Sequence, residues 1–142
     1  MGTRSTIAVK HEDETVSQVY CHWDGYLEHN GKLLVENYNT LEAAERLVCG
    51  GDMSSLGRRI EPIGVHTFGD REKDTTVYYG RDRGEDWAQT KPREFDSFEE
   101  FQRGFQSEEY DYLFMAGTWV VRVHGEFAGV VSELIAPQIA EE

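Results

Sequence analysis

The chain has 142 residues and carries 27 acidic residues against 14 basic ones, which gives a formal net charge of −13. Such a charge argues against direct binding to nucleic acid or to anionic membranes, and it favours basic partner surfaces. Hydrophobic residues form 39% of the chain, too large a share for a disordered acidic segment. We therefore expect one compact domain over residues 1–142 with its carboxylates on the outside.

The first half of the chain predicts a hairpin of two strands followed by two helices. Apolar and polar residues alternate on either side of a polar turn at 11–14, as they do in strands. After the break at Asp24-Gly25, apolar residues recur at helical spacing, and Gly50-Gly51 supplies a helix stop. The expected elements are strands over 5–10 and 16–23 and helices over 27–38 and 41–48.

The second half predicts a long loop, one helix and further strands. Residues 52–74 are irregular, and ordered loops of this length are often functional. Residues 97–100 form a capping box, and three phenylalanines between 98 and 105 share one face of the helix that follows. The expected strands cover 75–81, 110–115, 118–124 and 127–134. The whole pattern predicts an α+β domain with a mainly antiparallel sheet and about three helices packed on one face.

The cysteine content and the lack of long apolar runs predict where in the cell the protein is located. Cys21 and Cys49 are the two cysteines, and we expect them to be free, buried thiols, as in a reducing cytoplasm. No long apolar run follows the first five residues, so we expect no signal peptide. No stretch approaches the roughly 20 apolar residues that span a bilayer. The sequence therefore predicts a cytoplasmic protein without a membrane span.

The densest group of chemically capable side chains lies between Tyr20 and Tyr26. Cys21 and His22 are neighbours in a strand and point to opposite faces, so they cannot pair as nucleophile and base. The cysteine and histidine spacing does not match a zinc site, and we expect neither a metal nor a cofactor. One interpretation places Cys21 and Trp23 in the core, and the other makes Tyr20, His22 and Tyr26 the wall of a ligand pocket.

A second group is the pair Arg81 and Arg83 in a turn bounded by glycines. Two arginines at this spacing could clamp a phosphate or a carboxylate. Alternatively, they pair with the aspartates and glutamates of the same turn. If they converge with the aromatic group, the site would hold a nucleotide, with the rings on its base and the arginines on its phosphates. The residues of this alternative ligand site are Tyr20, His22, Tyr26, Arg81 and Arg83.

The third group is the acidic segment 93–111, which holds seven carboxylates against two arginines. One interpretation is a solvated helix face that only keeps the protein soluble. The other is a ridge of carboxylates spaced like the phosphates of a nucleic acid, which a nucleic-acid-binding protein would accept. A tyrosine in the segment would act as an anchor. The predicted partner-binding residues are Glu94, Asp96, Glu99, Glu100, Glu108, Glu109, Tyr110 and Asp111.

Two strings of the sequence carry a resemblance to a known group of proteins. They are Val19-Tyr20-Cys21-His22-Trp23-Asp24-Gly25-Tyr26 and Tyr79-Gly80-Arg81-Asp82-Arg83-Gly84-Glu85. With the segment at 4–9, they make the chain similar to small proteins encoded by bacteriophages and prophages. This resemblance implies a phage gene product in the cytoplasm of a bacterial host, where small acidic phage proteins often antagonise host defence. It implies no catalytic residues.

The sequence therefore predicts a non-enzymatic, acidic, phage-type inhibitor that binds and blocks a nucleic-acid-binding bacterial defence protein. Anti-CRISPR and anti-restriction proteins are examples of this class. The alternative function is a small-molecule-binding protein that sequesters a nucleotide immune signal. A nucleotide hydrolase comes third, because no base and nucleophile can be paired in the sequence. No catalytic residue is assigned.

Overall fold

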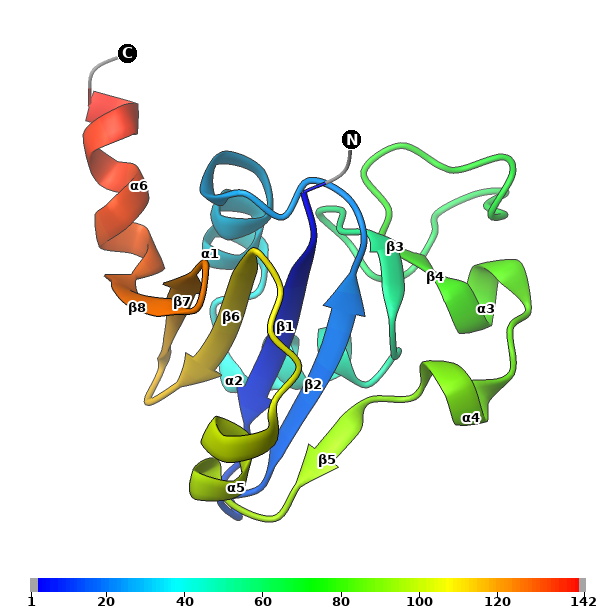
Figure 1. Cartoon of the computed structure of the whole chain (residues 1–142). Helices are drawn as coiled ribbons and strands as arrows, with labels where there is room; N and C mark the ends of the chain where they lie inside the picture. Colours follow the sequence, from blue (N-terminus) through cyan, green and yellow to red (C-terminus); the bar gives the residue numbers. More distant parts are fainter. Residues whose placement is uncertain (1–2, 141–142) are drawn as a thin grey trace.

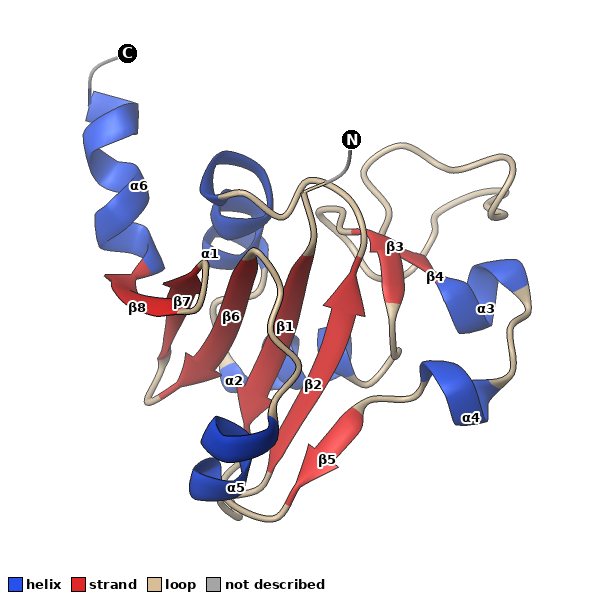
Figure 2. Cartoon of the chain, in the orientation of Figure 1, coloured by secondary structure: helices blue, strands red, loops and turns tan. Residues whose placement is uncertain are grey.

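The computed structural model describes residues 3–140, which fold around one mixed β-sheet (Figures 1 and 2). The strands are β1 (Ser5–Lys10), β2 (Val16–Cys21), β3 (Met53–Ser55), β4 (Val77–Tyr78), β5 (Arg93–Phe95), β6 (Tyr110–Met115), β7 (Thr118–Val123) and β8 (Glu126–Val130). They lie in the order β4-β3-β2-β1-β6-β7-β8, and β5 pairs with β2 outside this path. The predicted α+β class is confirmed.

Helices lie on both faces of the sheet (Figure 2). They are η1 (Leu27–Gly31), α1 (Lys32–Asn37), α2 (Leu41–Val48), α3 (Tyr79–Arg83), α4 (Trp87–Thr90), α5 (Phe98–Gly104) and α6 (Val131–Ala140). In Figure 1, α5 lies in front of the sheet and α2 behind it. Within residues 3–140, no helix combines the length and the apolar character that crossing a membrane requires.

The main core lies between the sheet and the helices η1, α1, α2 and α6. Successive strand residues alternate between faces, so every second residue of the central strands is directed to this side. Ile7 and Val9 of β1 and Val19 of β2 are fully buried there, with Leu47 of α2 and Trp119 of β7. Burial of this apolar surface is the main stabilising contribution to the fold.

A second, smaller core lies on the opposite face, where the sequence predicted no helix. Phe101 of α5 is 6% exposed and packs with Ala8, Val16 and Leu113 of the sheet. Its ring lies 5.0 Å from that of Phe105. The expectation of helices on a single face is therefore wrong for α5, because the alternating strands are apolar on both faces at this end.

The sheet is mixed because two of its strand pairs are parallel. β1 runs parallel to β6 and β2 runs parallel to β3, whereas the other pairs are antiparallel. The outer edge of β2 is shared: Val16–Gln18 pairs with β5, and Cys21 pairs with Met53 of β3. This division leaves β5 beside the turn that joins β1 to β2.

The strand expected over 16–23 ends at Cys21, and two other expected strands turn into helices. The strand expected over 75–81 is reduced to β4. α3 then runs from Tyr79 to Arg83 and is capped by Gly84, whose φ of 80° suits glycine. The strand expected over 127–134 ends at Val130, and α6 begins at the next residue. Short apolar runs do not distinguish a strand from a buried helix, and here tertiary contacts select the helix.

The long loop at 56–76 is ordered by the carboxylate of Glu72. The backbone N–H groups of Ile63 and Gly64 donate to it at 2.9 Å and 2.6 Å, and the Thr75 hydroxyl donates at 2.7 Å. These donors lower the pKa of Glu72 to about 2. The loop is thus tied by a carboxylate that stays ionised.

Candidate functional site at the acidic end of the sheet

Acidic side chains line a shallow depression where the β1–β2 turn, α2 and β5 meet. We use the name acidic end for this depression and the exposed carboxylates near the start of α5, taken together. The depression is lined by His11, Glu12, Asp13, Thr15, Ser17, Glu45 and Glu94. The exposed residues at the start of α5 are Asp96, Glu99 and Glu100.

Strand pairing and helix capping bring these segments together. Ser17 of β2 is directly opposite Glu94 of β5 in the antiparallel register. α2 starts at a Thr40 N-cap whose side chain accepts a hydrogen bond from the N–H of Ala43. One helical turn later, α2 presents Glu45 to the β1–β2 turn. The acidic end is therefore built from segments far apart in the sequence.

A chain of hydrogen bonds runs through the acidic end. The Ser17 hydroxyl has one proton and donates it to Glu94, with 2.8 Å between Ser17 Oγ and Glu94 Oε2. His11 Nε2 lies 2.7 Å from the same serine oxygen, within hydrogen-bond distance. His11 Nδ1 lies 2.5 Å from Glu45 Oε2, and an ionised carboxylate only accepts. His11 thus bridges Glu45 and Ser17, and Ser17 continues the chain to Glu94.

The order Glu45, His11, Ser17 is that of the acid, base and nucleophile of a serine hydrolase, but the bonding differs. In a hydrolase the serine proton goes to the histidine, whereas here it goes to Glu94. The Glu94 carboxylate would also repel the oxyanion that forms in acyl transfer. Ser17 is 5% exposed, which limits its access to a substrate. We interpret the chain of hydrogen bonds as a tie between the β1–β2 turn, α2 and β5.

The acidic end keeps an excess of negative charge. Its depression is lined by four carboxylates and a single histidine, so the carboxylates outnumber any positive charge there. Hydrogen bonds from the Thr15 hydroxyl and N–H lower the pKa of Asp13. Among the described residues, neither Asp96 nor Glu99 has a basic side chain within ion-pairing distance. The end therefore presents carboxylates that internal cations do not neutralise.

The predicted acidic ridge is divided between two ends of the sheet. Phe95 pairs with Val16 beside the β1–β2 turn, whereas Tyr110 pairs with Ser5 at the start of β1. At about 3.4 Å per strand residue, these positions lie about 17 Å apart along the strands. Glu94, Asp96, Glu99 and Glu100 belong to the acidic end, and Glu108, Glu109 and Tyr110 lie toward the opposite end.

Asp111 is buried and is not a surface carboxylate. It is 6% exposed, and its oxygens accept hydrogen bonds from the hydroxyls of Thr6 at 2.8 Å and Ser107 at 3.0 Å. The backbone N–H of Glu108 donates to it at 2.9 Å. The strand register explains this position, because Asp111 of β6 lies beside Thr6 of β1. Asp111 therefore does not offer a free carboxylate to a partner, contrary to the expectation from sequence.

We expect the Asp111→Asn substitution to change how stability depends on pH. Burial raises the pKa of Asp111 above its ordinary value of 3.8, and this effect outweighs the hydrogen bonds from Glu108, Thr6 and Ser107. The protonated form therefore stabilises the folded protein, and its contribution is lost as the pH rises through the raised pKa. The unfolding free energy of the wild type minus that of the variant should fall by on the order of 1 kcal/mol between about pH 4 and about pH 7.

Urea denaturation of both proteins at each pH measures this difference. The Asn side chain has nearly the same shape and can still accept from Thr6 and Glu108, so a change in packing should not obscure the trend. A difference that stays constant or grows with pH would show that the ionised carboxylate is the stabilised form, and the interpretation would be wrong.

Arg81 and Arg83 are committed to contacts within the chain. The Arg81 guanidinium donates to Asp82 at 2.8 Å and to the carbonyl of Ile60 at 2.7 Å. Arg83 lies 3.5 Å from the carboxylate of Glu85. The alternative in which these arginines pair with acids of their own turn is therefore confirmed, and little of Arg81 remains to bind a phosphate.

The aromatic residues of the alternative ligand site lie in separate surroundings. The hydroxyl of Tyr20 is 2.8 Å from Nδ1 of His22, whereas the Tyr26 ring lies 6.1 Å from that of His29. Tyr20 lines a depression with Arg4, Asp52, Arg93, Gln106 and Glu108, to which none of the other four residues of this site contributes. The structure therefore does not gather the five residues into this depression.

Cys21 is buried, whereas Cys49 and Trp23 are exposed to solvent. Burial raises the pKa of the Cys21 thiol to about 12, so it is an unreactive core residue. Cys49 is free as expected but exposed, because it caps the end of α2. Trp23 is 40% exposed, so the interpretation that put it in the core is wrong. Within residues 3–140, no group of three metal-binding side chains is placed to hold an ion.

Sequence reasoning missed every lining residue of the depression except Glu94, and His11, Ser17 and Glu45 are the three that hold it together. Each of them belongs to a different segment, and no motif links them. Comparison of the chain with protein-family models, with curated proteins and with solved structures finds no match. The functional argument therefore depends on the chemistry of the site.

Proposed function

We propose that the protein is a non-enzymatic acidic inhibitor that binds a basic, nucleic-acid-binding protein, namely a bacterial defence protein, and blocks its nucleic-acid site. The observation that carries the proposal is the acidic end, where carboxylates from the β1–β2 turn, α2 and β5 meet beside those of α5. A surface of this sign is attracted to the same basic groove as a nucleic acid.

The fixed geometry of the acidic end favours binding over a purely solubilising role. Glu45 and Glu94 are held by hydrogen bonds from His11 and Ser17, and Glu100 accepts from the N–H of Asp96 at 3.1 Å. Side chains that are already ordered lose less entropy when a partner binds. A surface that served solubility alone would not need such ties.

The test neutralises the acidic end and compares it with an equal change of charge elsewhere. The test variant carries Glu94→Gln, Asp96→Asn, Glu99→Gln and Glu100→Gln. The control variant carries Glu36→Gln, Glu61→Gln, Glu126→Gln and Glu133→Gln, all at exposed positions. Both variants lose four negative charges, so only the position of the lost charge differs between them.

Each protein is immobilised and used to capture basic proteins from a bacterial lysate, and bound proteins are then released with duplex DNA. We expect the wild type and the control to capture the same DNA-releasable proteins, with about tenfold less capture by the test variant. Release should also occur at moderate salt, because salt screens the charges. Equal loss in both variants, or capture that DNA does not reverse, would contradict the proposal.

A further inference from the structure

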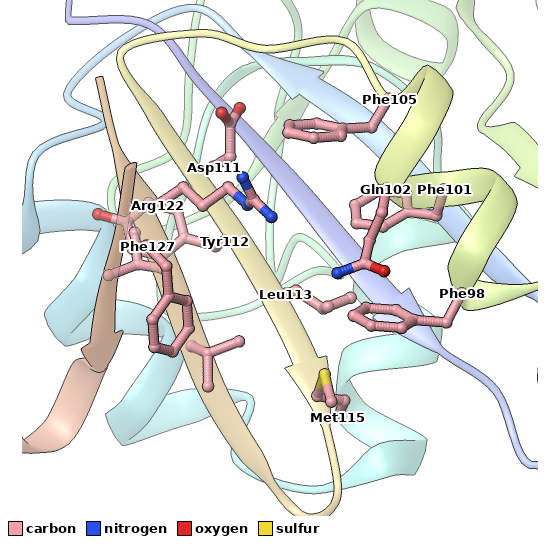
Figure 3. A pocket seen from close by; sticks show the side chains of 12 residues that line it. Phe98, Phe101, Gln102, Phe105, Asp111, Tyr112, Leu113, Met115, Arg122 and Phe127 are labelled. Atoms are coloured by element: carbon pink, nitrogen blue, oxygen red, sulfur yellow. The ribbon is translucent and has the colours of Figure 1, made fainter. Parts of the chain in front are cut away.

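An apolar groove lies on the face of the sheet that α5 only partly covers, between α5 and strands β6–β8 (Figure 3). Its volume is about 390 Å³, within the range of roughly 300–1,000 Å³ of small-molecule sites. Phe98 and Phe105 line the side formed by α5, and Leu113 and Val120 form the floor. Phe127 of β8, at the opposite rim, is 65% exposed and presents apolar surface at the edge of the groove.

Arg122 brings a positive charge into this groove without an internal partner. It is directly opposite Asp111 in the register of β6 and β7, where an ion pair across the strands would be expected. Asp111 instead accepts from Thr6, Ser107 and Glu108. Among the described residues, no carboxylate lies within ion-pairing distance of the Arg122 guanidinium and no acceptor takes a hydrogen bond from it.

The direction of the Arg122 side chain is set by an aromatic ring. Its guanidinium lies over Phe105, with 5.4 Å between Cζ and the ring centroid, which is a favourable cation–π distance. Figure 3 shows the guanidinium extending into the groove, whereas the Asp111 carboxylate points away. The carboxamide of Gln102 also points into the groove from α5. The groove thus joins an apolar wall to one donor-rich cation.

We propose that this groove binds a small amphipathic carboxylate, whose apolar body lies between Phe98 and Phe127 and whose carboxylate pairs with Arg122. A guanidinium is the side chain best suited to bind a carboxylate through two hydrogen bonds. In a chain with net charge −13, a second copy of the protein is a poor occupant because the two copies repel each other. The inference is independent of the proposed inhibition, since the groove contains none of the residues of the acidic end.

Three probes with the same alkyl chain and different head groups test the proposal: octanoate, octanol and octylammonium. The net negative charge of the protein favours octylammonium wherever binding is unspecific, so a preference for octanoate requires a local cation. We expect octanoate to bind about tenfold more tightly than octanol and to shift the amide NMR signals of Leu113, Val120 and Phe127. Affinity should rise about fourfold for each methylene added from hexanoate to octanoate.

Two variants separate the head-group site from the apolar wall. Arg122→Gln should remove the preference for octanoate over octanol, whereas Phe127→Ala should weaken both probes. Arg103→Gln is the matched control, because Arg103 is an exposed cation of α5 that does not line the groove. Thermal unfolding of each variant verifies that it is folded.

Several outcomes would overturn the proposal. These are equal affinity for the three probes in the wild type, an equal effect of the two arginine substitutions, or no shift of the groove signals at saturating probe. Groove signals that move with protein concentration in the absence of a probe would show that a second copy occupies the groove, which also contradicts the proposal.

Discussion

Replacing Trp119 with alanine is expected to lower the unfolding free energy by about 3–5 kcal/mol, a large part of the stability of a domain of this size. Trp119 is 1% exposed, and its ring lies 5.3 Å from that of Phe114 in an edge-to-face arrangement. Its indole N–H donates to the carbonyl of Tyr38 at 3.0 Å, and the Tyr38 hydroxyl donates to the carbonyl of Gly57 at 2.7 Å. The substitution therefore leaves a cavity and a buried carbonyl without a donor.

Urea denaturation measures this loss, and the other two tryptophans provide matched controls. Trp87 is 50% exposed and Trp23 is 40% exposed, so Trp87→Ala and Trp23→Ala should each cost less than about 1.5 kcal/mol. Trp119→Phe keeps most of the ring but loses the hydrogen bond, and it should cost about 1–2 kcal/mol. Equal losses for all three alanine substitutions would show that Trp119 does not anchor the end of α1 to the sheet.

Elements with strong local signals could be predicted from the sequence, and Trp119 illustrates where such prediction ends. The alternating residues of β1 gave its bounds, and the Ser97 side chain accepts from the N–H of Glu100, as the capping box predicted. Both signals act over a few residues. The contact between Trp119 and Tyr38 joins residues far apart in the chain, and no local pattern encodes it.

The candidate site was only partly predictable for the same reason. The carboxylates near the start of α5 could be identified because charge is a property of composition. Glu94 lies close to His11 and Glu45 because β5 pairs with β2. β5 has only three residues, and a strand this short carries no periodic signal from which the pairing could be predicted. Asp111 was counted as surface charge because burial of a carboxylate depends on donors from other segments, which here are Thr6 and Ser107.

The polar residues buried on the α5 face lead to the second large expected effect. Gln18 is fully buried, and its carboxamide pairs with the backbone of Gln106: it accepts from the N–H at 3.1 Å and donates to the carbonyl at 2.9 Å. It also donates to the Thr6 hydroxyl at 3.0 Å, and Thr6 donates to Asp111. A side chain thus replaces a strand partner for the segment that joins α5 to β6.

Gln18→Leu is expected to cost about 2–4 kcal/mol, because it preserves volume but leaves both backbone groups of the partly buried Gln106, and the buried Thr6 hydroxyl, without their partner. Gln89→Leu, at an exposed position of α4, should change the unfolding free energy by less than about 0.5 kcal/mol. Hydrogen exchange gives a second measurement: the Gln106 amide should exchange much faster in the Gln18 variant. Unchanged exchange would contradict the role assigned to Gln18.

The same substitution connects stability to the two proposed surfaces. The segment held by Gln18 begins just after Phe105, which caps the end of α5 and lines the apolar groove, and α5 itself contributes Glu99 to the acidic end. Loosening this segment should therefore weaken octanoate binding in the groove, even though Gln18 does not line it. The residues tied to the β1–β2 turn, such as Glu94 and Glu45, are held by His11 and Ser17 instead. Gln18→Leu should consequently reduce partner capture less than octanoate binding. Because Gln18 belongs to neither surface, this difference would show that the two sites act separately.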